Sequence, residues 1–250
     1  MVSLAPVREN ARMKSLLTQS EQLDRVIGVN CLVKWDFETI VDDTIFDSCN
    51  NYEGTIYGAT IMGGANDLQS LNFDGVDDFV DIGNFDIEFT DQFTITAWFK
   101  ADAWTNGGYH DGRIIDKSFN HYDNGIYWML STISAYDETR LRFRLKTDGQ
   151  TSVLIADSGD INLNKWHLAV VVYDGATLNL FLDGELVSSI AKSGTIDTSN
   201  DPVLLGNSSD LVRPWSGQID NVRMYTEAAS LSQIAQLYKD EKPKYKLAGF

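Results

Sequence analysis

Short segments in which apolar and polar residues alternate recur through the middle of this 250-residue sequence, and Asp-Gly dipeptides separate several of them. In the clearest segment, residues 141–146, apolar and basic side chains alternate, a pattern typical of a half-buried β-strand. Asp-Gly favours the positive φ angles of turns that reverse a strand, and it begins at Asp74, Asp111, Asp148, Asp174 and Asp183. Residues 166–190 therefore predict three strands joined by two tight turns. Many short strands with regular turns predict an all-β sandwich or jelly roll.

The two ends of the chain differ from this β-rich middle. Apolar residues recur with a helical period between Met13 and Ile27, and Gly28 supplies a stop, which predicts a short N-terminal helix within residues 1–29. Residues 231–239 predict a C-terminal helix with Ser230 as its N-cap. We therefore divide the chain into the N-terminal helix (1–29), the jelly roll with its helix (30–239) and a C-terminal tail (240–250), which is basic and weakly structured from Pro243 onward.

The charge balance of the chain excludes some partners. The sequence has 36 acidic and 20 basic residues, for a net charge of −16. Nucleic acid needs a basic surface, so we expect no nucleic acid partner. An acidic surface can instead gather cations such as Ca²⁺ through carboxylate oxygens. Residues 1–10 lack the apolar stretch of a signal peptide, which predicts either a cytosolic protein or one whose leader is missing from this sequence.

An ordered set of motifs extends across most of the chain. It begins with Trp35-Asp36-Phe37-Glu38, Gly54-Thr55-Ile56 and Leu71-Asn72-Phe73-Asp74-Gly75-Val76-Asp77-Asp78-Phe79-Val80. It continues with Phe93-Thr94-Ile95-Thr96-Ala97-Trp98-Phe99, Trp166-His167-Leu168-Ala169-Val170, Leu204-Leu205-Gly206 and Gly217-Gln218-Ile219-Asp220-Asn221-Val222-Arg223-Met224-Tyr225. In this order the motifs resemble the laminin-G-like family of concanavalin-type jelly rolls, over roughly residues 32–238. Two facing sheets then place Phe73, Val80, Ile95, Ala97 and Phe99 in the core, together with Trp35 and Trp98.

The N-terminal segment carries a second resemblance. Leu4-Ala5-Pro6-Val7-Arg8-Glu9-Asn10-Ala11-Arg12 and the residues that follow to Ile27 resemble the distal part of a type IV pilin or pseudopilin helix. The cleaved leader and the long apolar half of a pilin helix are absent from this sequence. The resemblance implies a truncated pilin at a bacterial cell surface, with other pilin-like subunits as partners. The alternative is a short amphipathic helix that packs on the sandwich.

Two loops are candidates for calcium, which the laminin-G-like resemblance implies at the rim of the sandwich. Ca²⁺ prefers six to eight oxygen ligands from carboxylates, amides and carbonyls. The positions that match the family's loops are Asp123, Asn124, Asn207 and Asp210. The alternative is that these residues form ordinary turns in surface loops. The three histidines lack zinc-ligand spacing, so calcium is the only metal that we expect.

Aromatic residues in predicted loops are candidates for ligand binding. Tyr and Trp combine an apolar face with a polar tip, which suits sugars or peptides. The candidates are Trp104, Tyr109, His110, Tyr122 and Trp215. Their alternative role is to cover the ends of loops.

The two cysteines, Cys31 and Cys49, allow either one disulfide or two free thiols. We predict the disulfide, which is consistent with an oxidising exterior.

The functional hypothesis is a non-catalytic binding or adhesion module outside the cell, with a glycan or an extracellular protein as its ligand. One alternative is a glycan-cleaving enzyme or its accessory carbohydrate-binding domain, which needs two carboxylates on one strand face. The nearest acidic run, residues 86–91, lacks a third acid in register, and the sequence has no nucleophile elbow, phosphate loop or dinucleotide fingerprint. We therefore expect no enzyme. A second alternative is a structural spacer without a ligand.

Overall fold

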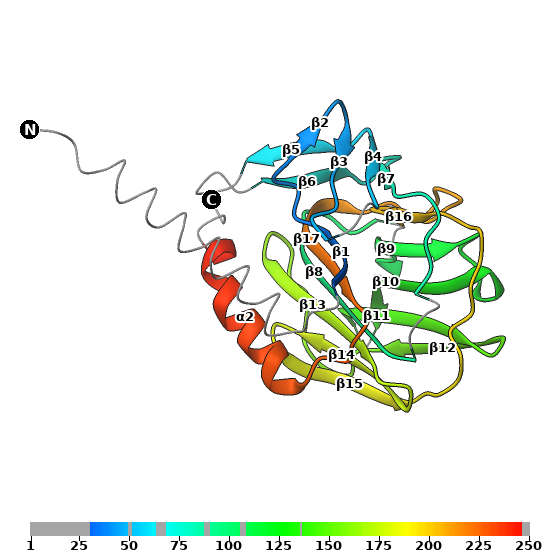
Figure 1. Ribbon diagram of the computed structural model, residues 1–250. Helices are drawn as coiled ribbons and strands as arrows, with labels where there is room; N and C mark the ends of the chain where they lie inside the picture. Colours follow the sequence, from blue (N-terminus) through cyan, green and yellow to red (C-terminus); the bar gives the residue numbers. More distant parts are fainter. Residues whose placement is uncertain are drawn as a thin grey trace, which may run out of the picture.

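The computed structural model describes residues 31–49, 52–63, 69–87, 91–105, 109–135 and 137–246. It is a sandwich of two antiparallel sheets with a helix along one outer face (Figure 1). The predicted all-β jelly-roll class with a C-terminal helix is therefore confirmed. The predicted N-terminal helix of residues 1–29 lies outside the described residues. Among the described residues, no helix has both the length and the apolar character needed to cross a bilayer.

Each sheet is built from strands that are distant in the sequence. Sheet A has the order β15 (Glu185–Ala191), β14 (Thr177–Leu182), β13 (Trp166–Tyr173), β8 (Phe93–Ala101), β17 (Ser216–Tyr225), β6 (Gln69–Asp74) and β5 (Thr60–Gly63), and β1 (Cys31–Trp35) also pairs with β17. Sheet B has the order β12 (Gln150–Ile155), β11 (Glu138–Thr147), β10 (Ile126–Ala135), β9 (Arg113–Ser118), β16 (Val203–Leu205), β7 (Phe79–Asp81), β4 (Gly54–Tyr57), β3 (Thr44–Ile45) and β2 (Ile40–Val41).

The alternating pattern decides which side chains enter the core between the sheets. On β11, Leu141, Phe143 and Leu145 are fully buried and belong to this core. The predicted core residues Phe73, Val80, Ile95, Ala97 and Phe99 are buried in the same cluster, and so is Trp35. Trp98 is also buried, but it lies on the other face of sheet A, because successive side chains of a strand point to opposite faces.

Two of the Asp-Gly dipeptides make the tight hairpins that the sequence predicts. Asp148 and Gly149 connect β11 to β12, and Asp183 and Gly184 connect β14 to β15. All four residues have positive φ angles, between 48° and 86°. A two-residue hairpin turn of the primed type requires this conformation, because only then does the turn match the strand twist.

The outer face of sheet A is covered by the helix α2 (Leu231–Lys246). Its buried Ile234 and Leu237 pack with Trp98, Leu168 and Val170 in a second apolar cluster. The predicted N-cap is present, because the Ser230 hydroxyl accepts the Gln233 amide at 3.4 Å and the Gln233 side chain accepts the Ser230 amide at 2.8 Å.

The helix is longer than the sequence predicts, and the expectation of weak structure from Pro243 onward is wrong for residues 243–246. Its last turns contain Glu241 and Tyr245, which are 1% and 6% exposed. Both make polar contacts with sheet A, so tertiary contacts hold this part of the helix. The exposed Pro243 lies within it. Helix propensity alone predicts an earlier end of the helix, because it takes no account of these contacts with sheet A.

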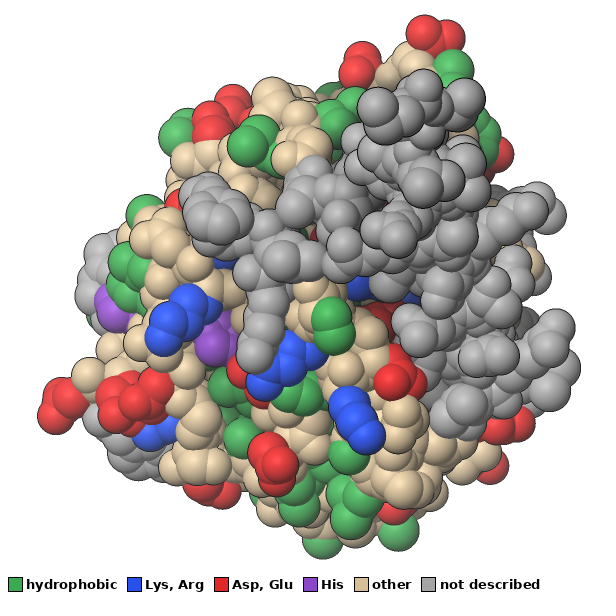
Figure 2. All heavy atoms as spheres, turned by 90° about the vertical axis from the view of Figure 1, so that its left-hand side faces the viewer, with side chains coloured by type: hydrophobic (Ala, Val, Ile, Leu, Met, Phe, Trp, Pro, Cys, Tyr) green, Lys and Arg blue, Asp and Glu red, His purple; other side chains and the backbone are tan. Residues whose placement is uncertain are grey.

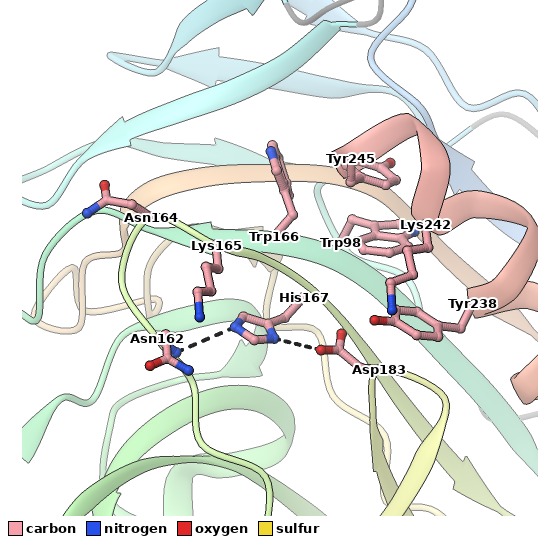
Figure 3. A pocket seen from close by; sticks show the side chains of 10 residues that line it. All are labelled: Trp98, Asn162, Asn164, Lys165, Trp166, His167, Asp183, Tyr238, Lys242 and Tyr245. Carbon is pink, nitrogen blue, oxygen red and sulfur yellow. Dashed lines mark hydrogen bonds and ion pairs between the residues drawn. The ribbon is translucent and has the colours of Figure 1, made fainter. Parts of the chain in front are cut away.

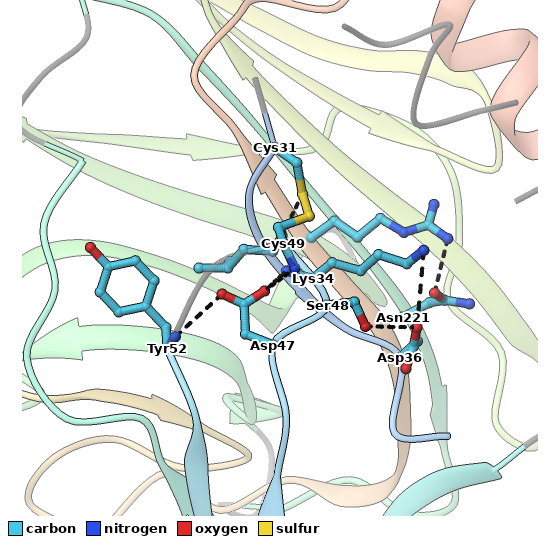
Figure 4. Close-up of a disulfide and its surroundings, with 10 residues drawn as sticks. Cys31, Lys34, Asp36, Asp47, Ser48, Cys49, Tyr52 and Asn221 are labelled. Carbon is cyan, nitrogen blue, oxygen red and sulfur yellow. Dashed lines mark hydrogen bonds and ion pairs between the residues drawn. A yellow bond between two sulfur atoms is a disulfide. The ribbon is translucent and has the colours of Figure 1, made fainter. Parts of the chain in front are cut away.

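A disulfide joins Cys31 on β1 to Cys49 in the loop after β3, with their Cα atoms 5.9 Å apart (Figure 4). The carboxylate of Asp47 organises this loop, since it accepts the backbone amides of Lys34 at 2.9 Å, Cys49 at 2.8 Å and Tyr52 at 3.3 Å. The bridge therefore fixes the start of β1, which pairs with β17 at the centre of sheet A.

Candidate binding site beneath the C-terminal helix

A cavity of about 480 Å³ lies between α2, the outer face of sheet A and the loop before β13 (Figure 3). Its volume falls within the roughly 300–1,000 Å³ of small-molecule sites. We call it the helix pocket. Its lining combines four aromatic side chains with polar and charged ones: Trp98, Asn162, Asn164, Lys165, Trp166, His167, Asp183, Tyr238, Lys242 and Tyr245.

The aromatic wall of the pocket comes from sheet A and α2 together. Trp98 of β8 stacks on Tyr245 of α2, with ring centroids 3.9 Å apart and planes 19° apart. Tyr238, two turns earlier on the helix, stacks on the same indole at 5.9 Å. Trp166, at the start of β13, meets Tyr245 at 5.0 Å. Because the four rings fix one another, this wall is rigid and apolar.

Two buried polar contacts hold the helix on the sheet behind this wall. Glu241 accepts the Trp98 indole N–H at 2.7 Å and pairs with Arg223 of β17 at 2.8 Å. The Tyr245 hydroxyl donates to Asp220 at 2.8 Å and accepts the Asn221 amide at 2.9 Å. Burial raises the pKa of Asp220 well above its usual range, and burial near that carboxyl also raises the pKa of Tyr245.

The polar side of the pocket is organised around His167. Its Nδ1 lies 2.9 Å from the Asp183 carboxylate, and its Nε2 accepts the backbone amide of Asn162 at 3.4 Å. The second Asp183 oxygen accepts the Leu168 amide at 2.9 Å. Both ring nitrogens and both carboxylate oxygens therefore have protein partners, so this pair positions the loop before β13.

Two lysines and an indole N–H complete the lining. Lys165 is exposed in the loop before β13. The Lys242 ammonium lies 4.6 Å from the Tyr238 ring centroid, and hydrogen bonding to the Tyr238 hydroxyl raises the pKa of this lysine. The Trp166 Nε1 is buried and has no hydrogen-bond partner. Basic side chains and a histidine gather in the middle of this face of the molecule (Figure 2).

The four residues predicted to bind calcium lie in two neighbouring loops, and the side chains of three of them are already bonded within the protein. Asp123 pairs with Arg144, while Asn124 is exposed. Asn207 is fully buried, and its carbonyl oxygen accepts the amides of Ser208 and Arg213.

Asp210 is similarly occupied, since one oxygen accepts the Ser208 hydroxyl at 2.7 Å and the other lies 2.5 Å from His121 Nδ1. These hydrogen bonds lower the pKa of Asp210, although burial opposes them. To bind calcium, Asp123, Asn207 and Asp210 would have to exchange protein donors for the ion, whereas Asn124 is exposed. Calcium binding at these residues stays a prediction for a titration.

The aromatic residues predicted to bind a ligand differ in their contacts and in their exposure. Trp104 stacks on His110 at 5.2 Å, and burial lowers the pKa of that histidine. Tyr109 and Tyr122 are exposed, at 74% and 63%. Trp215 is 2% exposed and packs edge-on against Phe99, so the prediction that it binds a ligand is wrong and its place is the core.

A buried charge cluster at sheet B was missed from the sequence. Asp111 pairs with Arg113 at 2.7 Å, with Arg213 at 3.1 Å and with Arg142, and Asp116 pairs with Arg113 at 3.0 Å. Burial raises the pKa of Asp116 to about 6 and lowers that of Arg142 to about 9. The Asp111-Gly112 dipeptide predicts a turn, and this local pattern does not reveal that Asp111 pairs with three arginines.

One group of three carboxylates among the described residues, Asp74, Asp77 and Asp78, has ligand atoms within 4.8 Å of one another. Asp78 accepts the Asp74 amide at 2.8 Å, and burial raises the pKa of Asp78. The hydrogen bond ties the two ends of this turn together.

Comparisons with known proteins agree with this fold. The family model Laminin_G_3, described as "Concanavalin A-like lectin/glucanases superfamily", matches residues 74–235. No curated protein matches the sequence.

Several solved structures share the fold. Domain 4 of AbnA, a GH43 extracellular arabinanase from Geobacillus stearothermophilus, in complex with arabinotriose, is 17% identical with a TM-score of 0.63, over 84% of this chain and 98% of that chain. The binding domain of Paraclostridial Mosquitocidal Protein 1 is 16% identical with a TM-score of 0.62, over 84% and 52%. The botulinum neurotoxin serotype D binding domain is 14% identical with a TM-score of 0.63, over 84% and 51%. This chain thus spans about half of each toxin domain, and at these identities the likeness concerns the fold.

Proposed function

The chain belongs to the concanavalin A-like lectin/glucanases superfamily, and from that premise we propose that it is a non-catalytic module that binds a glycan in the helix pocket. The observation that carries this proposal is the lining of the pocket, in which a rigid aromatic wall faces hydrogen-bonding side chains. Sugar rings present apolar C–H faces and a rim of hydroxyl groups, so they need both kinds of contact.

Two kinds of structural relative support a binding role. One is a domain of an extracellular arabinanase that was solved with arabinotriose, and the others are toxin binding domains. The arabinanase domain matches this chain over nearly its whole length, which makes a self-contained glycan-binding module the appropriate comparison.

A non-catalytic role is supported by the state of the candidate acids and bases. In the helix pocket, the nitrogens of His167 and the oxygens of Asp183 are hydrogen-bonded within the protein. In the sheet B cluster, Asp111 and Asp116 are paired with arginines. A glycosidase needs one carboxyl group that donates a proton and a second that attacks or activates water. Release of reducing sugar from a polysaccharide panel would contradict this part of the proposal.

A binding experiment tests both the function and its location. The protein is applied to a glycan array, and Kd for the best ligand is measured by calorimetry for the wild type and for Trp166→Ala, Tyr109→Ala and Tyr122→Ala. We expect Trp166→Ala to weaken binding at least about 10-fold, as for a buried aromatic anchor. The two rim variants should bind like the wild type. An array with no bound glycan would refute the function, while loss of binding in the rim variants alone would refute the location.

We also propose an extracellular location, which the disulfide between Cys31 and Cys49 supports because such bonds persist in oxidising compartments. Attachment to a pilin-like filament rests on the sequence of residues 1–30, which lie outside the described residues. The gene sequence upstream of Val2 tests it: a leader peptide and an apolar helix are expected, and an ordinary start would contradict it.

A further inference from the structure

The groups that the helix pocket offers to a ligand are mostly cations and hydrogen-bond donors. Among the described residues that line it, Asp183 is the only carboxylate, and it accepts hydrogen bonds from His167 and from the Leu168 amide. Glu241 lies behind the Trp98 ring, where it is 1% exposed and bonded to the indole and to Arg223. Glu241 is therefore turned away from the cavity, whereas Asp183 remains in the lining with both oxygens hydrogen-bonded and adds to the positive shift in the pKa of Lys242.

The positive groups are arranged differently. Lys165 and Lys242 both line the cavity, and in the close view they lie on either side of His167 (Figure 3). Neither ammonium forms an ion pair with a carboxylate of the described residues. The buried Trp166 Nε1 in the same lining lacks an acceptor. Because this atom is buried, we do not count it among the groups that a ligand in the cavity can reach, and the two lysines carry the argument.

We propose that the helix pocket selects acidic saccharides, in which a sugar ring carries a carboxylate or a sulfate group. This inference rests on the proposed glycan-binding function. The sugar ring packs on the Trp166 and Tyr238 side of the aromatic wall, and its anionic group lies between Lys165 and Lys242. The chain as a whole carries a charge of −16 and repels anions. Binding of an anionic ligand is therefore favourable only where nearby cations, here the two lysines of the cavity, offset this repulsion.

The experiment uses matched pairs of glycans on one array: polygalacturonate and its carboxyl-reduced form, and heparin and a heparin that is both desulfated and carboxyl-reduced, so that the second member of each pair is neutral. Acidic members should bind at least about 10-fold more tightly than their neutral partners, which is the size of one charge-assisted contact. Preference for polygalacturonate identifies a carboxylate ligand, and preference for heparin alone identifies a sulfate ligand. Because the contacts are ionic, raising NaCl from 20 to 500 mM should weaken binding.

Three substitutions locate the effect. Lys165→Gln and Lys242→Gln should each lower the affinity for the acidic glycan about 10-fold and leave neutral glycans unaffected. The control is Lys146→Gln, since Lys146 lies on sheet B, 5.0 Å from the Tyr127 ring, and should leave binding unchanged. Circular dichroism checks that each variant is folded.

The possible failures can be told apart. If neutral and acidic partners bind equally, or if the acidic preference persists in the Lys165→Gln/Lys242→Gln double variant, the inference is wrong while glycan binding stands. If no glycan on the array binds, the proposed function fails and this inference fails with it.

Discussion

The hydroxyl of Tyr245 provides the sharpest test of how α2 is held on sheet A. Tyr245→Phe keeps the ring that stacks on Trp98 at 3.9 Å, and removes only the bonds to Asp220 and Asn221. Two buried polar groups then lose a partner, and each such group costs about 1–3 kcal/mol. We expect the free energy of unfolding to fall by about 3 kcal/mol, which for a chain of this size lowers Tm by roughly 9 °C.

The loss should also depend on pH. In the wild type, the bond from Tyr245 stabilises the charged Asp220 carboxylate and so opposes the rise in its pKa that burial causes. The substitution removes this bond, which raises the pKa of Asp220 further. The variant is therefore penalised most at high pH, where the carboxyl is charged, and the difference from the wild type shrinks as the pH falls.

Urea unfolding followed by tryptophan fluorescence measures both effects at several pH values. The matched control is Tyr122→Phe, because Tyr122 is 63% exposed and should change stability by less than about 0.5 kcal/mol. A Tyr245→Phe loss as small as that of the control would show that the hydroxyl does not hold the helix.

Three further predictions concern the rest of the sandwich. Replacing Cys31 and Cys49 by serine opens a bridge across 18 positions and should lower the free energy of unfolding by about 3 kcal/mol; denaturant curves that coincide with the wild type would contradict this. Because burial raises the pKa of Asp116 to about 6, the folded state binds that proton more tightly than the unfolded chain does. This contribution is complete below about pH 4 and is lost as the pH rises through 6, in total about 3 kcal/mol. Asp116→Asn should flatten this part of the stability profile, and an unchanged slope would exclude Asp116 as its source. Trp215→Ala should destabilise the protein by about 3–5 kcal/mol, because it truncates a core side chain, and should leave the Kd for a glycan unchanged. If the folded variant binds the glycan more weakly than the wild type does, Trp215 contacts the ligand.

The sequence was sufficient for features that depend on local chemistry. The alternation at Leu141, Phe143 and Leu145 predicts the buried face of β11, because the two-residue period of a strand is fixed by its backbone. Asp183-Gly184 predicts a hairpin because few other dipeptides adopt positive φ at both positions without strain.

The helix pocket could not be predicted in this way. Its lining comes from β8, the loop before β13, the start of β13, the turn after β14 and the last turns of α2. Taken singly, Lys165, Tyr238 and Lys242 are ordinary surface residue types. Only the position of α2 brings them together, and that position depends on buried contacts such as those of Glu241, which have no local signal.

The rim loops show a different limit. The sequence correctly places Asn207 and Asp210 in a loop after a short strand, but ligand chemistry depends on which oxygens remain available. That depends on the partners His121 and Arg213, which the fold supplies. A residue type with the right ligand atom is therefore a weak predictor of a site until its protein partners are known.

The two candidate surfaces lie on different sheets, so variants of each surface can show which of the two binds the ligand. The helix pocket is on the outer face of sheet A, whereas Asp123 and Tyr122 belong to a loop between strands of sheet B, with the apolar core between the sheets. Substitutions that share no partners act independently, so each set of variants reports on its own surface. Glycan binding lost with Trp166→Ala and retained in Tyr122→Ala places the ligand under α2, and the opposite pattern places it at the rim. Equal weakening by both variants is not compatible with a single site on either sheet.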